Sequence, residues 1–274
     1  MSNSRLAGGS TLLGRTSCNR GKLKNNILIM QLHKIFTMVA LLVALSASAA
    51  VSSRFYDVDG LRYSVNAETK EATLVANQYT LSDVAVPSSI TVDGTAYQVT
   101  ALGPLCFRGC TDLVSVTLPS SVKKLGNLCF YNCTSLESIT IPNSVTRMGL
   151  RCFSGCTSLE KITLSSALKR LEKETFYNCT SLESITIPDA VTMLGDGCFQ
   201  GCTGLASVSL GKAVTTLGEF CFNGCTSLES ITLPDAVTTL GDYCFAECTS
   251  LKSVSMTGKV NVSRTSFYKC PNLM

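Results

Sequence analysis

A unit of 23 residues recurs in register through the last two thirds of this 274-residue chain. In one copy, the run Ile139-Thr140-Ile141-Pro142 is followed by a glycine, by Cys152-Phe153 and by Cys156, and the same residue types return at each step. Regular units begin at Val116, Ile139, Ile162, Ile185, Val208, Ile231 and Val254. A longer first unit begins at Val84, and its extra residues are expected to form a hairpin around Asp93-Gly94. Such a chain is expected to fold as a stack of similar coils, each of which touches only its neighbours.

The period also predicts the architecture of each coil. A fixed period of about 20 to 29 residues with one short β-like run is typical of a leucine-rich-repeat solenoid. Alternation points the two isoleucines of the run inward and Thr140 outward, and Pro142 ends the strand because proline cannot donate to a ladder. Cys152 and Phe153 are expected to open a short helical turn. We therefore predict eight coils over residues 84–274, with a parallel β-ladder on one face and short helical turns on the other.

Three segments are expected before the repeats. Residues 1–29 are interpreted as an upstream extension that is not part of the natural protein. Residues 30–49 combine a basic start, an apolar run and small residues, the pattern of a secretory signal peptide, and a membrane anchor is the alternative. Residues 50–83 contain an Asp59-Gly60 hairpin signal and predict a small β cap over the first coil. The signal peptide would make the mature chain secreted or displayed at the cell surface, with no membrane span.

The charge balance argues against several classes of function. Residues 1–49 hold six of the 23 basic residues and none of the 19 acidic ones, so the remainder has a net charge of 17 − 19 = −2. A near-neutral body lacks the electrostatic footprint of a nucleic-acid-binding protein. The only histidine, His33, lies inside the predicted signal peptide. A mature chain without histidine cannot form a Ser-His-Asp triad.

The 15 cysteines leave three interpretations open. Most occur as pairs with three residues between the partners, a spacing found among zinc ligands, and secreted proteins also use cysteines in disulfide frameworks. The third interpretation, buried free thiols, is favoured because Thr175 and Ser266 replace the first cysteine in two units. That replacement points to a requirement for size and not for a ligand, so no metal or other cofactor is expected.

Hydroxyl side chains occupy the outward strand positions of successive units. They are either a polar face for a ligand or ordinary soluble strand residues. The candidate ligand-binding residues of this strand face are Ser138, Thr140, Thr163, Ser184, Thr186, Ser207, Ser209, Ser230 and Thr232. Two acidic columns could form a glycosidase pair or a weak calcium site, but solvated edges are the favoured interpretation. These columns contain Glu137, Glu160 and Glu183, and Asp196, Glu219 and Asp242.

The unit that runs from Leu136 to Cys156 resembles the BspA-like leucine-rich repeats of bacterial surface proteins. Its specific marks are the proline after the strand, the glycine at the bend and the Phe-x-x-Cys turn, and the resemblance covers residues 84–274. It implies secretion or surface display and adhesion to host proteins or to other cells. It implies no catalytic residues.

Together these patterns predict a non-enzymatic binding or adhesion module. Its strand face would recognise a protein or a glycan of the host or of a neighbouring cell. The alternative is a structural scaffold that self-associates through its C-terminal coil, and a hydrolase is a remote third hypothesis because the mature chain offers neither a histidine nor a predicted pocket.

Overall fold

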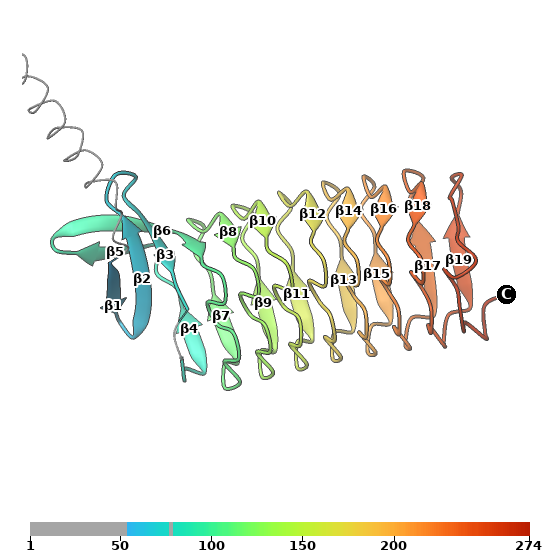
Figure 1. The fold of residues 1–274 in the computed structure, drawn as a ribbon, viewed down its shortest axis with the longest axis horizontal. Helices are drawn as coiled ribbons and strands as arrows, with labels where there is room; N and C mark the ends of the chain where they lie inside the picture. Colours follow the sequence, from blue (N-terminus) through green and yellow to red (C-terminus); the bar gives the residue numbers. More distant parts are fainter. Residues whose placement is uncertain (1–53, 77–78) are drawn as a thin grey trace, which may run out of the picture. The chain divides into compact units, whose positions relative to one another are not determined.

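The computed structural model describes residues 54–76 and 79–274 (Figure 1). The predicted upstream extension and signal peptide lie outside these residues, so both stay predictions. The described residues belong to one compact unit. They are organised as strands and turns, and within these two ranges there is no helix that could cross a membrane.

Six of the seven regular coils contribute two short strands each, whereas the sequence predicted one, and the coil that begins at Val254 contributes one. The first column of strands consists of β4 (Asp83–Ala85), β7 (Ser115–Thr117), β9 (Ser138–Thr140), β11 (Lys161–Thr163), β13 (Ser184–Thr186), β15 (Ser207–Ser209), β17 (Ser230–Leu233) and β19 (Ser253–Met256). The second column consists of β8 (Lys124–Leu125), β10 (Arg147–Met148), β12 (Arg170–Leu171), β14 (Met193–Leu194), β16 (Thr216–Leu217) and β18 (Thr239–Leu240). Figure 1 shows both columns running along the stack of coils.

Strands of neighbouring coils pair in parallel and in register. Thr163 lies opposite Thr140 in the first column, and Leu217 lies opposite Leu194 in the second. The first column is divided into the sheets β4-β7-β9-β11, β13-β15 and β17-β19. This division differs from the predicted continuous ladder, although the coils remain stacked throughout.

Two antiparallel hairpins precede the regular coils, as the Asp-Gly signals predicted. One joins β1 (Phe55–Val58) to β2 (Leu61–Asn66), and the other joins β5 (Ser89–Val92) to β6 (Thr95–Leu102). At both tips the aspartate and the glycine have positive φ, 50° and 78° at Asp59-Gly60 and 48° and 73° at Asp93-Gly94, which a type I′ turn requires. β3 (Glu71–Leu74) pairs with β2 and with β6, and β6 pairs with β8. The hairpins therefore extend the second strand column.

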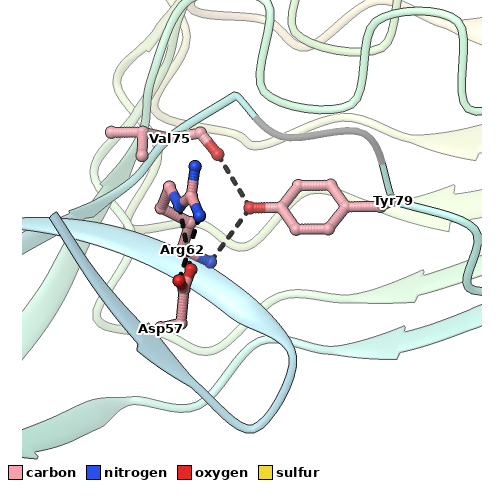
Figure 2. A network of polar contacts seen from close by, with 4 residues as sticks. All are labelled: Asp57, Arg62, Val75 and Tyr79. Atoms are coloured by element: carbon pink, nitrogen blue, oxygen red, sulfur yellow. Dashed lines mark hydrogen bonds and ion pairs between the residues drawn. The ribbon is translucent and has the colours of Figure 1, made fainter.

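A polar network fastens the first hairpin to the coils (Figure 2). The hydroxyl of Tyr79 accepts a hydrogen bond from the Arg62 amide at 3.1 Å and donates one to the Val75 carbonyl at 2.8 Å. The Arg62 guanidinium in turn binds both carboxylate oxygens of Asp57, at 2.9 and 3.0 Å. The ring of Tyr79 lies 5.3 Å from that of Phe107, so the same residue holds the hairpin and covers the first core phenylalanine. Burial raises the pKa of Tyr79 to about 12.

The segments expected as helical turns are hydrogen-bonded turns. In the coil that contains Phe153, Arg151 and Gly155 both have left-handed φ, 52° and 77°, so only three residues between them can be right-handed. The Phe153 amide donates to the carbonyl of Thr175 in the next coil, at 2.9 Å. A helix needs several consecutive right-handed residues whose amides bond within the segment. Bonding between coils replaces the helix here.

Phenylalanine rings form the centre of the core. Consecutive rings are stacked nearly parallel, with centroids 5.0 to 5.7 Å apart and interplanar angles of 4° to 13°. The members of this phenylalanine column are Phe107, Phe130, Phe153, Phe176, Phe199, Phe222, Phe245 and Phe267. All except Phe267 are fully buried, so each coil covers the ring of the previous one.

Candidate functional site

The predicted strand face exists as an exposed surface. All nine candidate hydroxyl residues are exposed, and they lie on β9, β11, β13, β15 and β17. The residues between them, such as Ile139 and Ile162, are buried. Alternation along a pleated strand explains this arrangement, because successive side chains point to opposite faces.

Two shallow hollows divide the predicted residues into groups. The first hollow has a volume of about 710 Å³ and lies over β7, β9 and β11. It is lined by Ser138, Thr140 and Thr163, and by Ser115, Thr117 and Lys161, which were not among the predicted site residues. The second hollow, of about 470 Å³, is lined by Ser207, Ser209, Ser230, Thr232 and also Lys212. Ser184 and Thr186 lie on β13 between the two groups and line neither hollow.

The hollows are polar and carry little charge. Each contains one lysine, Lys161 in the first and Lys212 in the second. At the end of the first column, the Ser115 hydroxyl donates to Asp83 at 2.6 Å and the Ser82 hydroxyl donates to it at 2.8 Å. These hydrogen bonds hold the pKa of Asp83 below its usual value. Hydroxyl groups with an isolated cation can bind amide or sugar oxygens by hydrogen bonds, and they supply no nucleophile–base pair.

The cysteines have a structural explanation. In the range that the structure describes, 14 cysteines are free, and all are buried except Cys270, which is half-buried. The cysteines three residues after the core phenylalanines form the second cysteine column. From Cys133 onward, each thiol of this column donates to the carbonyl of a phenylalanine in the preceding coil, at 3.0 to 3.2 Å. The donors are Cys133, Cys156, Cys179, Cys202, Cys225, Cys248 and Cys270. These thiols therefore link neighbouring coils by hydrogen bonds.

The other cysteine column tolerates hydroxyl residues for a related reason. Where Thr175 replaces cysteine, its hydroxyl donates to the Glu172 carbonyl at 2.6 Å and the residue stays fully buried. Where Ser266 replaces it, the hydroxyl accepts a hydrogen bond from the Ser263 amide at 3.1 Å. Burial raises the pKa of Cys202 to about 12, which opposes formation of the thiolate that a metal or a redox reaction would use.

The two acidic columns are exposed edges. Glu137, Glu160 and Glu183 are exposed, as are Asp196, Glu219 and Asp242. Hydrogen bonds from Ser263 and Thr265 hold the pKa of Asp242 below its usual value, which is the opposite of what a general acid requires. Among the residues described, no group of three or more His, Cys, Asp or Glu side chains is placed to hold a metal ion.

Known proteins share this architecture. The model of the BspA type leucine rich repeat region matches residues 77–196 and 169–274, with six copies of the repeat. A leucine rich cell surface protein from Faecalibacterium prausnitzii is 31% identical with a TM-score of 0.69, and the match covers 77% of this chain and 56% of that one. This chain thus corresponds to little more than half of that protein's structure. No curated protein matches the chain.

Two further crystal structures resemble this one. The leucine rich repeat protein of T. pallidum is 28% identical with a TM-score of 0.64, over 72% of this chain and 91% of that one. A leucine-rich repeat protein from Bacteroides ovatus is 26% identical with a TM-score of 0.50, over 80% and 69%. The repeat period, the stacked coils and the family model agree, and the chain belongs to the BspA-type leucine-rich repeat family.

Proposed function

We propose that the chain is a secreted or surface-exposed, non-enzymatic binding or adhesion module. Its ligand is a protein or a glycan of the host or of a neighbouring cell, bound on the first strand column. The observation that carries this proposal is the pair of hydroxyl-lined hollows, of about 710 and 470 Å³, on that exposed face. The name of the F. prausnitzii relative, a cell surface protein, supports the proposed location.

The chemistry of the hollows favours binding over catalysis. A hydrolase needs a nucleophile or activated water, a positioned base and a site that excludes bulk water. The hollows offer hydroxyls and isolated lysines on an open face. They can make many weak hydrogen bonds over a long surface, which suits adhesion.

Charge substitutions can test the assignment of this face. The full chain would be screened against glycan arrays and immobilised extracellular-matrix proteins. For the ligand found, Thr140→Glu and Thr232→Glu, one in each hollow, should each weaken binding at least tenfold. Thr186→Glu, between the hollows, should have a smaller effect. Thr192→Glu lies on an exposed position outside the first column and serves as the control. Unchanged affinity in both hollow variants, with folded protein, would remove the strand face as the site.

Self-association is the second candidate function. Four large apolar side chains are exposed on the coil that begins at Val254, and they include Met256 at 39% and Tyr268 at 51%. A second copy could cover them, because an apolar surface of this kind is stabilised by contact with another. Sedimentation velocity over a hundredfold concentration range tests this, and Met256→Lys should abolish any oligomer. A monomer at all concentrations would refute the scaffold hypothesis.

A further inference from the structure

Cations are aligned on the second strand column, on a face that the proposed function does not use. Lys124 of β8, Arg147 of β10 and Arg170 of β12 occupy the same position in three successive coils. Arg147 and Lys124 are direct partners in the parallel pair, so their Cα atoms are separated by about one strand spacing, ~4.8 Å. Lys123 and Lys169 flank them, and all five side chains are exposed. We call these five residues the cation row.

Carboxylates neutralise only part of the cation row. Glu71 lies 3.7 Å from Lys123, and Glu172 lies 3.4 Å from Arg170. Among the described residues, Lys124, Arg147 and Lys169 form no ion pair. The row thus keeps about three uncompensated positive charges on three neighbouring coils.

The fold does not require these cations. The same strand position is Met193, Thr216 and Thr239 in the later coils, and the strands there pair in the same way. Like charges placed opposite each other on neighbouring strands are destabilising. The cation row therefore carries an energetic cost that neutral residues avoid elsewhere in the same molecule, and an anionic ligand would offset this cost.

The edge beside this column becomes acidic in the later coils. Lys173 is followed one, two and three coils later by Asp196, Glu219 and Asp242 at the equivalent position. Residues 54–173 hold 12 basic and 10 acidic residues, and residues 174–274 hold five basic and nine acidic ones, so the two halves have net charges of +2 and −4. Oppositely charged halves produce a local field that attracts an anion to one half and repels it from the other.

A small hollow adjoins the cation row. It has a volume of about 240 Å³ and is lined by Lys124 and Arg147, by Asn127 and Thr73, and by backbone near Gly126. A Cβ atom added at Gly126 would lie 2.5 Å from the backbone carbonyl carbon of Gly103 in the previous coil. The hollow is therefore bounded by two coils that pack closely at this glycine. It has room for one anionic substituent between two cations and two neutral hydrogen-bonding groups.

We propose that the cation row binds an extended anionic polysaccharide, whose sulfate or carboxylate groups follow β8, β10 and β12 along the solenoid. A repeating line of charges on the ligand matches a repeating line of cations on the coils. Single-stranded nucleic acid is disfavoured because its binding depends on aromatic platforms for the bases, and the hollow beside the row is lined by no aromatic side chain. The site is separate from the hydroxyl hollows of the first column.

The test uses heparin as the probe and the full chain as the protein. Titration calorimetry at several salt concentrations should show that the logarithm of the association constant falls linearly with the logarithm of the salt concentration. Lys124→Ser, Arg147→Ser, Lys169→Ser and Arg170→Ser together should weaken heparin binding at least thirtyfold at 0.1 M salt. Circular dichroism should show that this variant remains folded.

Matched controls decide the interpretation. Lys252→Ser, Lys259→Ser, Arg264→Ser and Lys269→Ser together remove the same charge from exposed positions outside the cation row and both hydroxyl hollows, and should change heparin affinity less than threefold. An equal loss in this control overturns the proposal, as does tighter binding to a DNA oligonucleotide than to heparin. Salt-sensitive self-association that depends on the cation row would identify a second copy as the occupant and also overturn it. Thr140→Glu and Thr232→Glu should leave heparin affinity unchanged, which separates this site from the proposed strand face.

Discussion

The phenylalanine column and the cation row repeat with the same period but follow different rules. Inside, every coil from Phe107 to Phe267 keeps a phenylalanine, and neighbouring rings stack within 5.0 to 5.7 Å. Outside, one strand position changes from Lys124, Arg147 and Arg170 to methionine and threonine in the later coils. An interior residue must fit two neighbouring coils at once, whereas an exterior residue must only be compatible with water. Differences between coils therefore collect on the surface, where the proposed functions lie.

Of the tests of this comparison, alkaline pH should have the largest effect, because it acts on the buried thiols of the interior. Burial raises the pKa of twelve thiols, namely those of Cys110, Cys129, Cys133, Cys152, Cys156, Cys179, Cys198, Cys202, Cys221, Cys225, Cys248 and Cys270. Above about pH 8.5 the unfolded chain releases these protons while the folded chain keeps them, so the free energy of unfolding falls as pH rises. One fully buried thiol contributes a slope of about 1.4 kcal/mol per pH unit once the pH is above the pKa of the unfolded chain. Several such thiols act together, so the free energy of unfolding falls steeply with pH.

We expect a sharp, cooperative unfolding between about pH 9 and pH 10.5 in reducing buffer. Circular dichroism against pH measures it, and full stability should be present below about pH 8. In the same buffers, alkylation of the native protein at pH 8 should be slow and should become fast in denaturant. A chain that keeps its fold at pH 11 would contradict the burial of these thiols.

A truncation in the phenylalanine column should have the next largest effect. Phe153 is fully buried between Phe130 and Phe176, with centroids 5.0 and 5.7 Å away. Phe153→Ala should lower the free energy of unfolding by about 3–5 kcal/mol, because it removes apolar contacts and leaves a cavity between two coils. Urea denaturation measures the loss. Phe153→Leu is the matched control and should lose less than half as much.

A turn residue between interior and surface should have an intermediate effect. Gly155 has a φ of 77°, and an added Cβ would meet the side chain of Asn132. Gly155→Ala should therefore cost about 1–2 kcal/mol. At the equivalent position of the previous coil, Asn132 has a φ of 56°, so Asn132→Gly should be neutral or slightly stabilising. Equal losses in the two variants would show that the turn geometry is not the cause.

The smallest effect is expected on the surface. Arg147→Ser should change the free energy of unfolding by no more than about 0.5 kcal/mol, and in the stabilising direction, because it removes repulsion from Lys124. The difference should disappear in 0.5 M salt, which screens charges at this separation. Urea denaturation at low and high salt checks both points. A loss of stability would mean that the arginine stem packs on the sheet.

Much of the fold follows from residues that act locally. The alternation around Thr140 and the stop at Pro142 predicted the first strand column, and the Asp-Gly pairs predicted both hairpins. These signals depend on backbone preferences that a single residue imposes. The second column gave no comparable signal, since Arg147–Met148 and its equivalents are two residues long and show no alternation.

The expected helical turns are not found in the described residues, for a physical reason that lies outside the segment. Residues such as Arg151 and Phe220 adopt left-handed φ, which their side chains do not favour. They do so because their backbone amides donate hydrogen bonds to carbonyl groups of the next coil. The sequence of the turn itself does not indicate that an acceptor lies in the next coil. The neighbouring coil therefore decides the backbone conformation.

The exposed positions of the candidate site were predictable, and their grouping was not. Alternation placed Ser138, Thr140 and the other hydroxyl residues on the outer face. The positions of the hollows depend on how neighbouring coils and the two lysines are placed. Thr186 lines neither hollow, although it is exposed like the other hydroxyl residues. The cation row was not predicted, because the net charge of the whole body sums a positive half and a negative half to nearly zero.

The direction of the bonds between coils has a consequence for how such a chain can change in length. From Phe107 to Phe245, each amide of the phenylalanine column donates forward, as Phe130 does to Cys152. From Cys133 to Cys270, each thiol of the second cysteine column donates backward, as Cys156 does to Phe130. One 23-residue copy thus supplies the groups that its predecessor needs and takes from its successor the groups that it lacks. Whole copies can be inserted or excised by recombination without leaving a mismatched joint, so the molecule can gain or lose reach in fixed increments.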